Sequence, residues 1–203
     1  IHQNLLSQGI VKLFISDKQK DNWFYAFSKR SIDILLSLSV IVFLFWLFPI
    51  IALLIKITSP GSVMFIQQRV GKNEKKFFCL KFRTMFQNTQ QAGTHEISNT
   101  SVTKIGTFLR KLHLDELPQI WNVLKNEMSF VGPRPSLPIQ DELILERNKR
   151  DVFTILPGIT GLSQVNGIDM SRPIELAVSD EQYLITRSLL LDLKILCKTV
   201  LPI

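Results

Sequence analysis

The chain has 203 residues, 46% of them hydrophobic, and a formal net charge of +7. That length suits one ordinary domain with a real core, and the positive charge fits nucleic acid, an anionic membrane surface or a phosphorylated substrate, with the apolar bias favouring the membrane. The two cysteines, Cys79 and Cys197, are far apart and form no CxxC motif. They exclude a disulfide scaffold and a zinc site, and we expect both thiols to be buried and reduced in a cytosolic compartment. The three scattered histidines indicate no metal site.

An uncharged run dominates the first quarter of the chain. We interpret residues 1–28 as an N-terminal segment of unclear role, either a truncated start or the tail of an upstream segment, because they begin without Met and lack the arrangement of a secretory signal. Residues 34–55 carry no charge, and a helix crosses a bilayer with roughly 17 to 25 such residues. We therefore expect residues 29–58 to form a membrane-embedded helix and residues 59–203 to form a cytosolic domain.

Two details predict that this helix bends. Pro49 lies inside it, where it removes a backbone donor and favours a kink after Phe48. Basic residues flank both ends, whereas the positive-inside tendency places Lys and Arg on the cytoplasmic side. A re-entrant helix with both ends on the cytoplasmic face satisfies both observations. A single kinked span is the alternative.

A β-hairpin is predicted next. The Ser59-Pro60-Gly61 turn precedes two β-like runs, over residues 63–68 and 76–82. The second run delivers two cations, Lys81 and Arg83, at and beyond its end. The polar residues 87–103 then predict a loop.

Two adjacent carboxylates, Asp115 and Glu116, stand where a helix is predicted to begin. Asp115 is a favourable N-cap, and Pro118 is tolerated only within the first helical turn. The positive helix end would favour the ionised carboxylate, which is the form that binds a hard cation or attacks an electrophile. A plain helix cap is the commoner role for such a pair. Arg110 upstream and Arg134 in a proline-rich bend, suited to a bidentate phosphate contact, favour the chemical role.

The remaining patterns predict further helices and turns. Residues 141–150 indicate a charged helix with a solvated face, and residues 157–161 a tight turn. Residues 189–201 predict either a core helix or an amphipathic helix on the membrane. Asn126 is expected to take the left-handed conformation at a helix end. The predicted core stripe behind the carboxylates consists of Leu117, Ile120, Trp121, Leu124 and Met128.

Taken together, these markers resemble the bacterial sugar transferase family, the monotopic polyprenyl-phosphate phosphoglycosyl transferases that begin surface-glycan assembly. The resemblance runs from about Lys29 to Thr199. Its motifs occur in family order: Lys29-Arg30 with Asp33, the apolar helix with its proline, SPGSVMFIQQRVG, KFRTM, IGTFLRKLHLDELPQIWNVLKNEMSFVGPRP, and PGITG with QVNG. It implies a membrane-associated α+β fold with a re-entrant membrane helix broken at Pro49, a small β-hairpin and several helices, including amphipathic interfacial ones. The catalytic domain, residues 59–203, would lie on the cytoplasmic face of the bacterial inner membrane.

The resemblance also implies a reaction. A sugar-1-phosphate passes from a nucleotide diphosphosugar, a UDP-sugar in our expectation, to undecaprenyl (polyprenyl) phosphate, with release of UMP and Mg²⁺ as cofactor. By motif position, Asp115 is the nucleophile and magnesium ligand, and Glu116 is its dyad partner. No nucleic-acid partner is implied. The expected phosphate- and substrate-binding residues are Arg110, Arg134, Lys81, Arg83, Gln164 and Asn166.

Four positions depart from the family's pattern. Phe48 stands before Pro49 where some members have serine. Leu156 occupies a position where a basic residue is common, Leu162 replaces a frequent Trp, and Ile168 replaces a frequent Arg. Because the last three remove aromatic and cationic groups, we expect them to affect the choice of sugar and to leave the phosphate chemistry intact.

Other functions fit the sequence less well. A glycosyltransferase that leaves the diphosphate behind commonly binds its metal through an Asp-x-Asp motif, which this sequence does not contain. A polytopic transferase of similar reaction needs many spans. A basic membrane-anchored module for anionic lipid or nucleic acid would explain the charge but not a carboxylate pair between two arginines.

Overall fold

The structure is a computed structural model that describes residues 23–87 and 101–201. Most of the N-terminal segment and of the predicted loop 87–103 lie outside these residues. The α-helices are α2 (Trp23–Leu44), α3 (Leu47–Thr58), α4 (Lys104–Lys111), α5 (Ile120–Leu124), α6 (Asp141–Asn148), α7 (Leu162–Val165), α8 (Pro173–Thr186) and α9 (Leu189–Val200). The strands are β1 (Met64–Val70), β2 (Lys76–Phe82), β3 (Ser129–Val131) and β4 (Gly158–Thr160), and the 3-10 segments are η1 (Lys72–Glu74), η3 (Leu114–Gln119) and η4 (Val152–Thr154).

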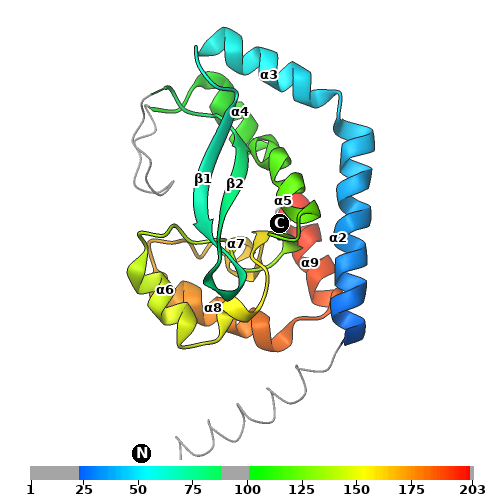
Figure 1. Cartoon of the computed structure of the whole chain (residues 1–203), viewed down its shortest axis with the longest axis vertical. Helices are drawn as coiled ribbons and strands as arrows, with labels where there is room; N and C mark the ends of the chain where they lie inside the picture. Colours follow the sequence, from blue (N-terminus) through cyan, green and yellow to red (C-terminus); the bar gives the residue numbers. More distant parts are fainter. Residues whose placement is uncertain (1–22, 88–100, 202–203) are drawn as a thin grey trace, which may run out of the picture.

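Helices and two small sheets share the described part of the chain, which confirms the mixed α and β composition. Figure 1 shows α2 running along one side of the molecule, with α3 turned across one end. The hairpin β1–β2 stands beside α4 and α5, and α6 and α8 close the opposite end. Contacts of α2 with α5, α9 and β3 join the N-terminal helix to the rest.

The predicted bend is present, but it lies upstream of the expected position. Axes of α2 and α3 differ by 65°, and the break falls at Phe45 and Trp46 instead of after Phe48. Pro49 sits in the first turn of α3, where a proline is tolerated, and its ring conflicts with a helical carbonyl four residues earlier, which is that of Phe45. No single described helix is long and apolar enough to cross a membrane, whereas α2 and α3 meet that test as a bent pair.

The bent pair has one face on the core and one face exposed. In α3, Ile51 and Ile55 pack with Phe82 and Leu109. An exposed apolar surface that extends over two adjoining helices is typical of a site of contact with a membrane or a protein. Its exposed residues on the two helices include Leu35, Leu38, Val42, Phe43, Ile50, Leu53 and Ile57.

The predicted hairpin is confirmed. Strands β1 and β2 pair antiparallel from Met64 opposite Phe82 to Val70 opposite Lys76. Cys79 is buried on its inner face, as expected, but Cys197 is exposed on α9, so its predicted burial is wrong. Both thiols are free.

A second sheet replaces the tight turn predicted at residues 157–161. Strand β4 lies there and pairs in parallel with β3. The strands approach so closely that a Cβ on Gly158 would lie 2.1 Å from the backbone nitrogen of Gly132. The sequence indicates a turn because glycine, which allows the close contact of β4 with β3, is also a typical turn residue. The pairing itself is not visible in the local pattern, because β3 is distant in the chain.

The apolar stripe behind the carboxylates is only partly a core. Ile120 and Met128 are buried as predicted, but Trp121 is 47% exposed and Val123 takes the buried position instead. The reason is the preceding 3-10 segment, which has three residues per turn. The predicted stripe assumes the spacing of an α-helix, so its positions do not fall on one face here. Asn126 has the expected left-handed conformation, with φ of 62°.

Helix α6 carries a buried ion pair where a solvated face was expected. Arg147 is 1% exposed, and its Nε and Nη2 donate to Asp180 Oδ2 of α8 over 2.9 and 2.6 Å. Ser163 Oγ donates to the other carboxylate oxygen over 3.1 Å. Helix α9 buries Ile195 and exposes Leu190 and Leu193 together with Lys194 and Lys198, so it is amphipathic. Whether α9 rests on a membrane stays a prediction.

Replacing Arg147 with Met should destabilise the fold by about 3 to 5 kcal/mol, because Asp180 would remain buried without its partner. Urea unfolding checks this value. The double variant Arg147→Met/Asp180→Leu should recover most of the loss, and Lys149→Gln, at an exposed pair on the same helix, should match the wild type. Equal stability of Arg147→Met and wild type would contradict the assignment.

Candidate active site

The carboxylate pair lies on η3, a 3-10 segment that continues into α5. His113, with φ of 55°, occupies the N-cap position, so the predicted capping role of Asp115 is wrong. Pro118 is accommodated inside the segment. Asp115 is 8% exposed. The left-handed turn at His113 therefore places both acids inside the first turn.

Two cations hold Glu116. Its Oε1 accepts from Lys81 Nζ over 2.5 Å and from Arg134 Nη2 over 3.1 Å. Lys81 comes from β2, and Arg134 follows β3. Burial alone would raise the pKa of Glu116, but the charges of Lys81 and Arg134 outweigh it and hold the pKa at about 2. Glu116 is consequently ionised across the physiological range, with one oxygen occupied by two cations.

Asp115 is in a different electrostatic environment. Burial, followed by repulsion from Glu116, raises its pKa above the ordinary value, while Lys81 and Arg110 act in the opposite direction. The helix end does not dominate, in contrast to the sequence-based expectation. Neighbouring carboxylates thus have pKa values shifted in opposite directions, an arrangement found where acids have separate chemical tasks.

Of the other predicted cations, Arg110 lies near the pair and Arg83 does not contact it. Arg110 Nε donates to Thr84 Oγ1 over 2.9 Å, and its charge acts on Asp115. Arg83 is buried and donates from Nη2 to the carbonyl of Ser59 over 2.7 Å. That contact ties β2 to the end of α3, which is a structural position.

Arg69 is a buried cation that sequence reasoning did not assign to the site. It is 6% exposed and donates from Nη1 to the carbonyl of Pro135 over 3.0 Å and from Nη2 to Gln67 Oε1 over 2.6 Å. Burial, assisted by the charge of Arg134, lowers its pKa to about 10. The signal was present in the alternation of β1, because residues 67 and 69 share one face of the strand.

The site has more positive than negative charge. Two carboxylates stand among four cations, namely Lys81, Arg69, Arg110 and Arg134. Buried charges without partners are costly, so this excess favours an anionic ligand. Guanidinium groups suit phosphate oxygens in particular.

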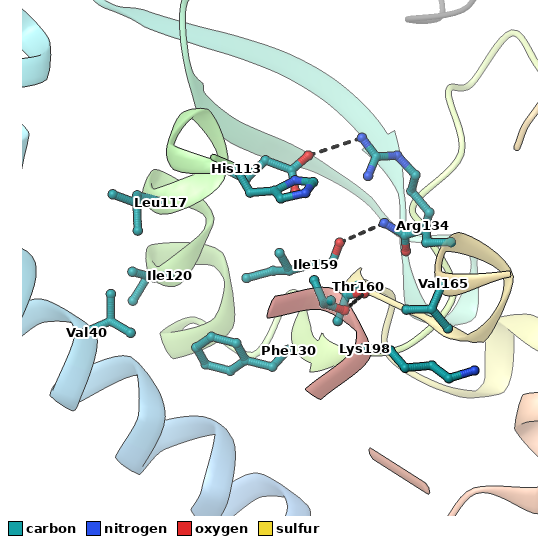
Figure 2. Close-up of a pocket in the computed structure, with 13 residues that line it drawn as sticks. Val40, His113, Leu117, Ile120, Phe130, Arg134, Ile159, Thr160, Val165 and Lys198 are labelled. Atoms are coloured by element: carbon teal, nitrogen blue, oxygen red, sulfur yellow. Dashed lines mark hydrogen bonds and ion pairs between the residues drawn. The ribbon is translucent and has the colours of Figure 1, made fainter. Parts of the chain in front are cut away.

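A cavity of about 410 Å³ adjoins the Glu116–Arg134 contact. Figure 2 shows Val40, Leu117 and Ile120 on one side and Arg134 and Lys198 on the other. This volume is within the roughly 300 to 1,000 Å³ of small-molecule sites. The full lining is Val40, His113, Glu116, Leu117, Ile120, Phe130, Arg134, Ile159, Thr160, Gln164, Val165, Lys198 and Thr199.

The structure separates the two predicted residues of the QVNG motif. Gln164 lines the cavity and donates from Nε2 to the carbonyl of Ile159 over 3.0 Å. Asn166 is exposed and is not part of the lining. Ile168 packs against the Leu143 cluster and Leu162 against the Val131 cluster, so both departures have packing roles.

The donor set suits a metal that is shared with a ligand. Within residues 23–87 and 101–201, no three His, Cys, Asp or Glu side chains gather as a metal cage. Glu116 is committed to cations, which leaves Asp115 as the acid of the pair available to a metal. Mg²⁺ is commonly held by one or two carboxylates together with substrate phosphates, so the residues present fit that arrangement.

The bacterial sugar transferase family matches residues 24–203. The chain belongs to this family. The predicted recognition is thereby confirmed, and the match covers every residue of the carboxylate pair, its cations and the cavity lining.

Relatives of this sugar transferase carry specific names. It is 39% identical over 190 residues to the UDP-N-acetylgalactosamine-undecaprenyl-phosphate N-acetylgalactosaminephosphotransferase of Aeromonas hydrophila, covering 87% of this chain and 43% of the relative. It is 38% identical over 192 residues to the exopolysaccharide production protein ExoY of Sinorhizobium fredii, covering 85% and 84%. It is 37% identical over 188 residues to the undecaprenyl-phosphate glucose phosphotransferase of Komagataeibacter xylinus, covering 85% and 35%. The chain thus spans less than half of the Aeromonas and Komagataeibacter relatives and most of the Sinorhizobium relative.

In this transferase, Lys81→Met should raise the pKa of Glu116. The folded pKa of about 2 lies below the ordinary value of 4.5, so ionised Glu116 contributes stability that is fully present above about pH 4.5 and lost as the pH falls through about 2. Without Lys81 the folded pKa of Glu116 should lie closer to 4.5, so the loss should be smaller and should be complete at a higher pH. Urea unfolding between pH 2 and 6 measures it, with Lys76→Met, exposed on the same strand, as control. We call the hold of Lys81 and Arg134 on Glu116 the clamp. Superimposable pH profiles for all three proteins would refute it.

Proposed function

We propose that the protein transfers a sugar-1-phosphate from a UDP-sugar to undecaprenyl phosphate and releases UMP. The observation that carries this proposal is the ionised Glu116 held by Lys81 and Arg134 directly beside Asp115. The printed names of the Aeromonas and Komagataeibacter relatives support the general reaction. Because those two names differ in their sugar, the sugar of this protein is a separate question.

Asp115 would act as the nucleophile. An oxygen of its carboxylate attacks the phosphorus that bears the sugar, and the bond from that phosphorus to the UMP oxygen breaks. The lipid phosphate oxygen then attacks the same phosphorus, and the Asp115 carboxylate leaves. Arg110 and Arg134 would spread the charge that develops on the phosphoryl oxygens.

Glu116 would position cations instead of carrying protons. A group with a pKa of about 2 is a weak base near neutral pH, and its Oε1 is already engaged. Mg²⁺ would be held by Asp115 with the donor's phosphates, and when bound it would supply positive charge that offsets repulsion between diphosphate and carboxylate.

The cavity would receive the sugar of the donor. It begins at Arg134, where a phosphate would bind, and its polar side includes Thr160, Gln164 and Lys198. Phe130 supplies an apolar wall for the C–H face of a ring. A polyprenyl chain would leave the buried Gln164 Oε1, which has no hydrogen-bond partner among the described residues, without one, at a cost of about 1 to 3 kcal/mol.

The bent pair α2–α3 would enter the inner membrane and return to the cytoplasmic face. Its exposed apolar residues and basic flanks support this topology. A basic module for anionic lipid or nucleic acid remains the weaker function, because Lys81 and Arg134 are half-buried and paired with Glu116 instead of being spread over a surface.

Asp115→Asn should lower turnover by about a thousandfold or more and abolish the phosphosugar adduct, because the amide cannot attack phosphorus. Intact-mass spectrometry of enzyme mixed with UDP-sugar alone is the measurement, over a panel of sugars. Asp141→Asn, at an exposed acid outside the site, is the control.

Since burial raises the pKa of Asp115, wild-type activity should fall on acidification at a pH above the ordinary aspartate value of 3.8. Sustained turnover without any adduct would rule out the covalent route.

Both ends of the bent pair should be on the cytoplasmic side. In a Cys197→Ser background, cysteines placed at Ser28 and at Ser62 should resist an impermeant thiol reagent in intact cells and react after permeabilisation. Labelling of either position in intact cells would establish a spanning helix instead.

A further inference from the structure

Arg30 of α2 binds the end of α5, the helix that continues the segment carrying the carboxylate pair. Its Nη1 donates to the carbonyl of Val123 over 2.7 Å, and its Nη2 donates to the carbonyl of Leu124 over 3.0 Å. These carbonyls end α5, where the helix dipole favours a cation, and the Val123 carbonyl also accepts from the backbone nitrogen of Asn126 over 3.0 Å. Because α5 continues η3 without a break, this fork fixes the far end of the segment that bears Asp115.

The same segment is tied to the strand of Lys81. Asn122 is buried in α5, accepts at Oδ1 from the backbone nitrogen of Leu80 over 3.1 Å, and donates from Nδ2 to the carbonyl of Phe78 over 2.8 Å. Arg30 therefore holds a unit that includes the carboxylate pair and the lysine that clamps it.

Asp33, one turn further along α2, binds the strand that leads to Arg134. It is 3% exposed, and its Oδ1 accepts from Ser129 Oγ and from the backbone nitrogen of Phe130, each over 3.1 Å. Arg134 follows β3 by three residues. Residues three apart share one face of a helix. From one face of α2, Arg30 and Asp33 therefore hold the two halves of the clamp, which are the segment with the carboxylate pair and the strand that leads to Arg134.

We infer that Arg30 and Asp33 are positioning residues that set the distance between the Asp115–Glu116 pair and Arg134. This inference rests on the proposed function for its kinetic consequence, but the geometry is independent of the substrate. A buried carboxylate and a guanidinium are costly in a mainly apolar helix unless their contacts repay them. Here their hydrogen bonds offset this cost, and they align two site segments that are distant in sequence.

Helix α2 also offers a matched control. Lys29 is adjacent to Arg30 and donates to Asp192 Oδ2 of α9 over 2.8 Å, an equally close contact that reaches neither half of the clamp. Asp192 keeps Tyr25 and Tyr183 as partners when Lys29 is replaced. Lys29→Met thus removes one contact of α2 and leaves the hydrogen bonds of Arg30 and Asp33 in place. Because the charge of Lys29 also favours ionised Asp33, this variant is the control for Arg30.

The experiment compares the full chain in lipid nanodiscs as wild type, Arg30→Met, Arg30→Lys and Lys29→Met. Amide hydrogen exchange of residues 114–124 should quicken about tenfold or more in Arg30→Met and stay unchanged in Lys29→Met. The single-turnover rate of adduct formation should fall about tenfold to a hundredfold with the donor KM within about twofold, because misplacement by about 1 Å costs rate. Arg30→Lys, which keeps a donor, should lie between the two.

Asp33→Ala should instead quicken exchange at residues 129–131 and raise the donor KM, and Asp33→Asn, which keeps the acceptor oxygen, should restore both. Unchanged exchange in Arg30→Met, or equal kinetic losses in Arg30→Met and Lys29→Met, would overturn the inference. Absence of any adduct in the wild type would refute the covalent route, and absence of UMP release from every UDP-sugar in the presence of undecaprenyl phosphate would refute the proposed function. In either case the exchange data would still decide whether Arg30 and Asp33 hold these segments.

Discussion

The ionised carboxylate of Glu116 is the interaction on which the site depends. It draws Lys81 and Arg134 to one oxygen, from a strand and from a bend that are distant in sequence. The charges of Lys81 and Arg110 act on the neighbouring Asp115. A single negative charge therefore organises the positive charges, and the positive excess that remains is what a diphosphate would neutralise.

The rest of the fold supplies fixed attachment for these charges. Asn122 joins α5 to β2, Arg69 holds the carbonyl of Pro135 next to Arg134, and α2 binds both α5 and β3. Most of these supports are hydrogen bonds to backbone groups. Such contacts fix the path of the chain and tolerate changes in neighbouring side chains.

Local patterns predicted what local physics determines. Alternation and turn residues indicated the hairpin, Pro49 indicated the bend, and motif order indicated the family. Features that depend on distant partners were missed: Arg147 reads as a surface residue until Asp180 is placed beside it, and Arg69 needs the Pro135 carbonyl. The misplaced Trp121 has another cause, since a 3-10 turn changes the helical phase in a way that side-chain periodicity does not show. In the candidate site, the sequence indicated the acids and arginines but not which cations contact which acid.

The two faces of α3 have a practical consequence for dissecting the protein. Ile51 and Ile55 belong to the same core as Phe82 at the end of β2 and Leu109 of α4. A truncation that removes residues up to 58, chosen to obtain a water-soluble fragment, would strip these side chains and expose Leu109 next to Arg110. The part of the chain that carries the candidate site cannot be excised cleanly at that boundary, because α3 is also one wall of its interior.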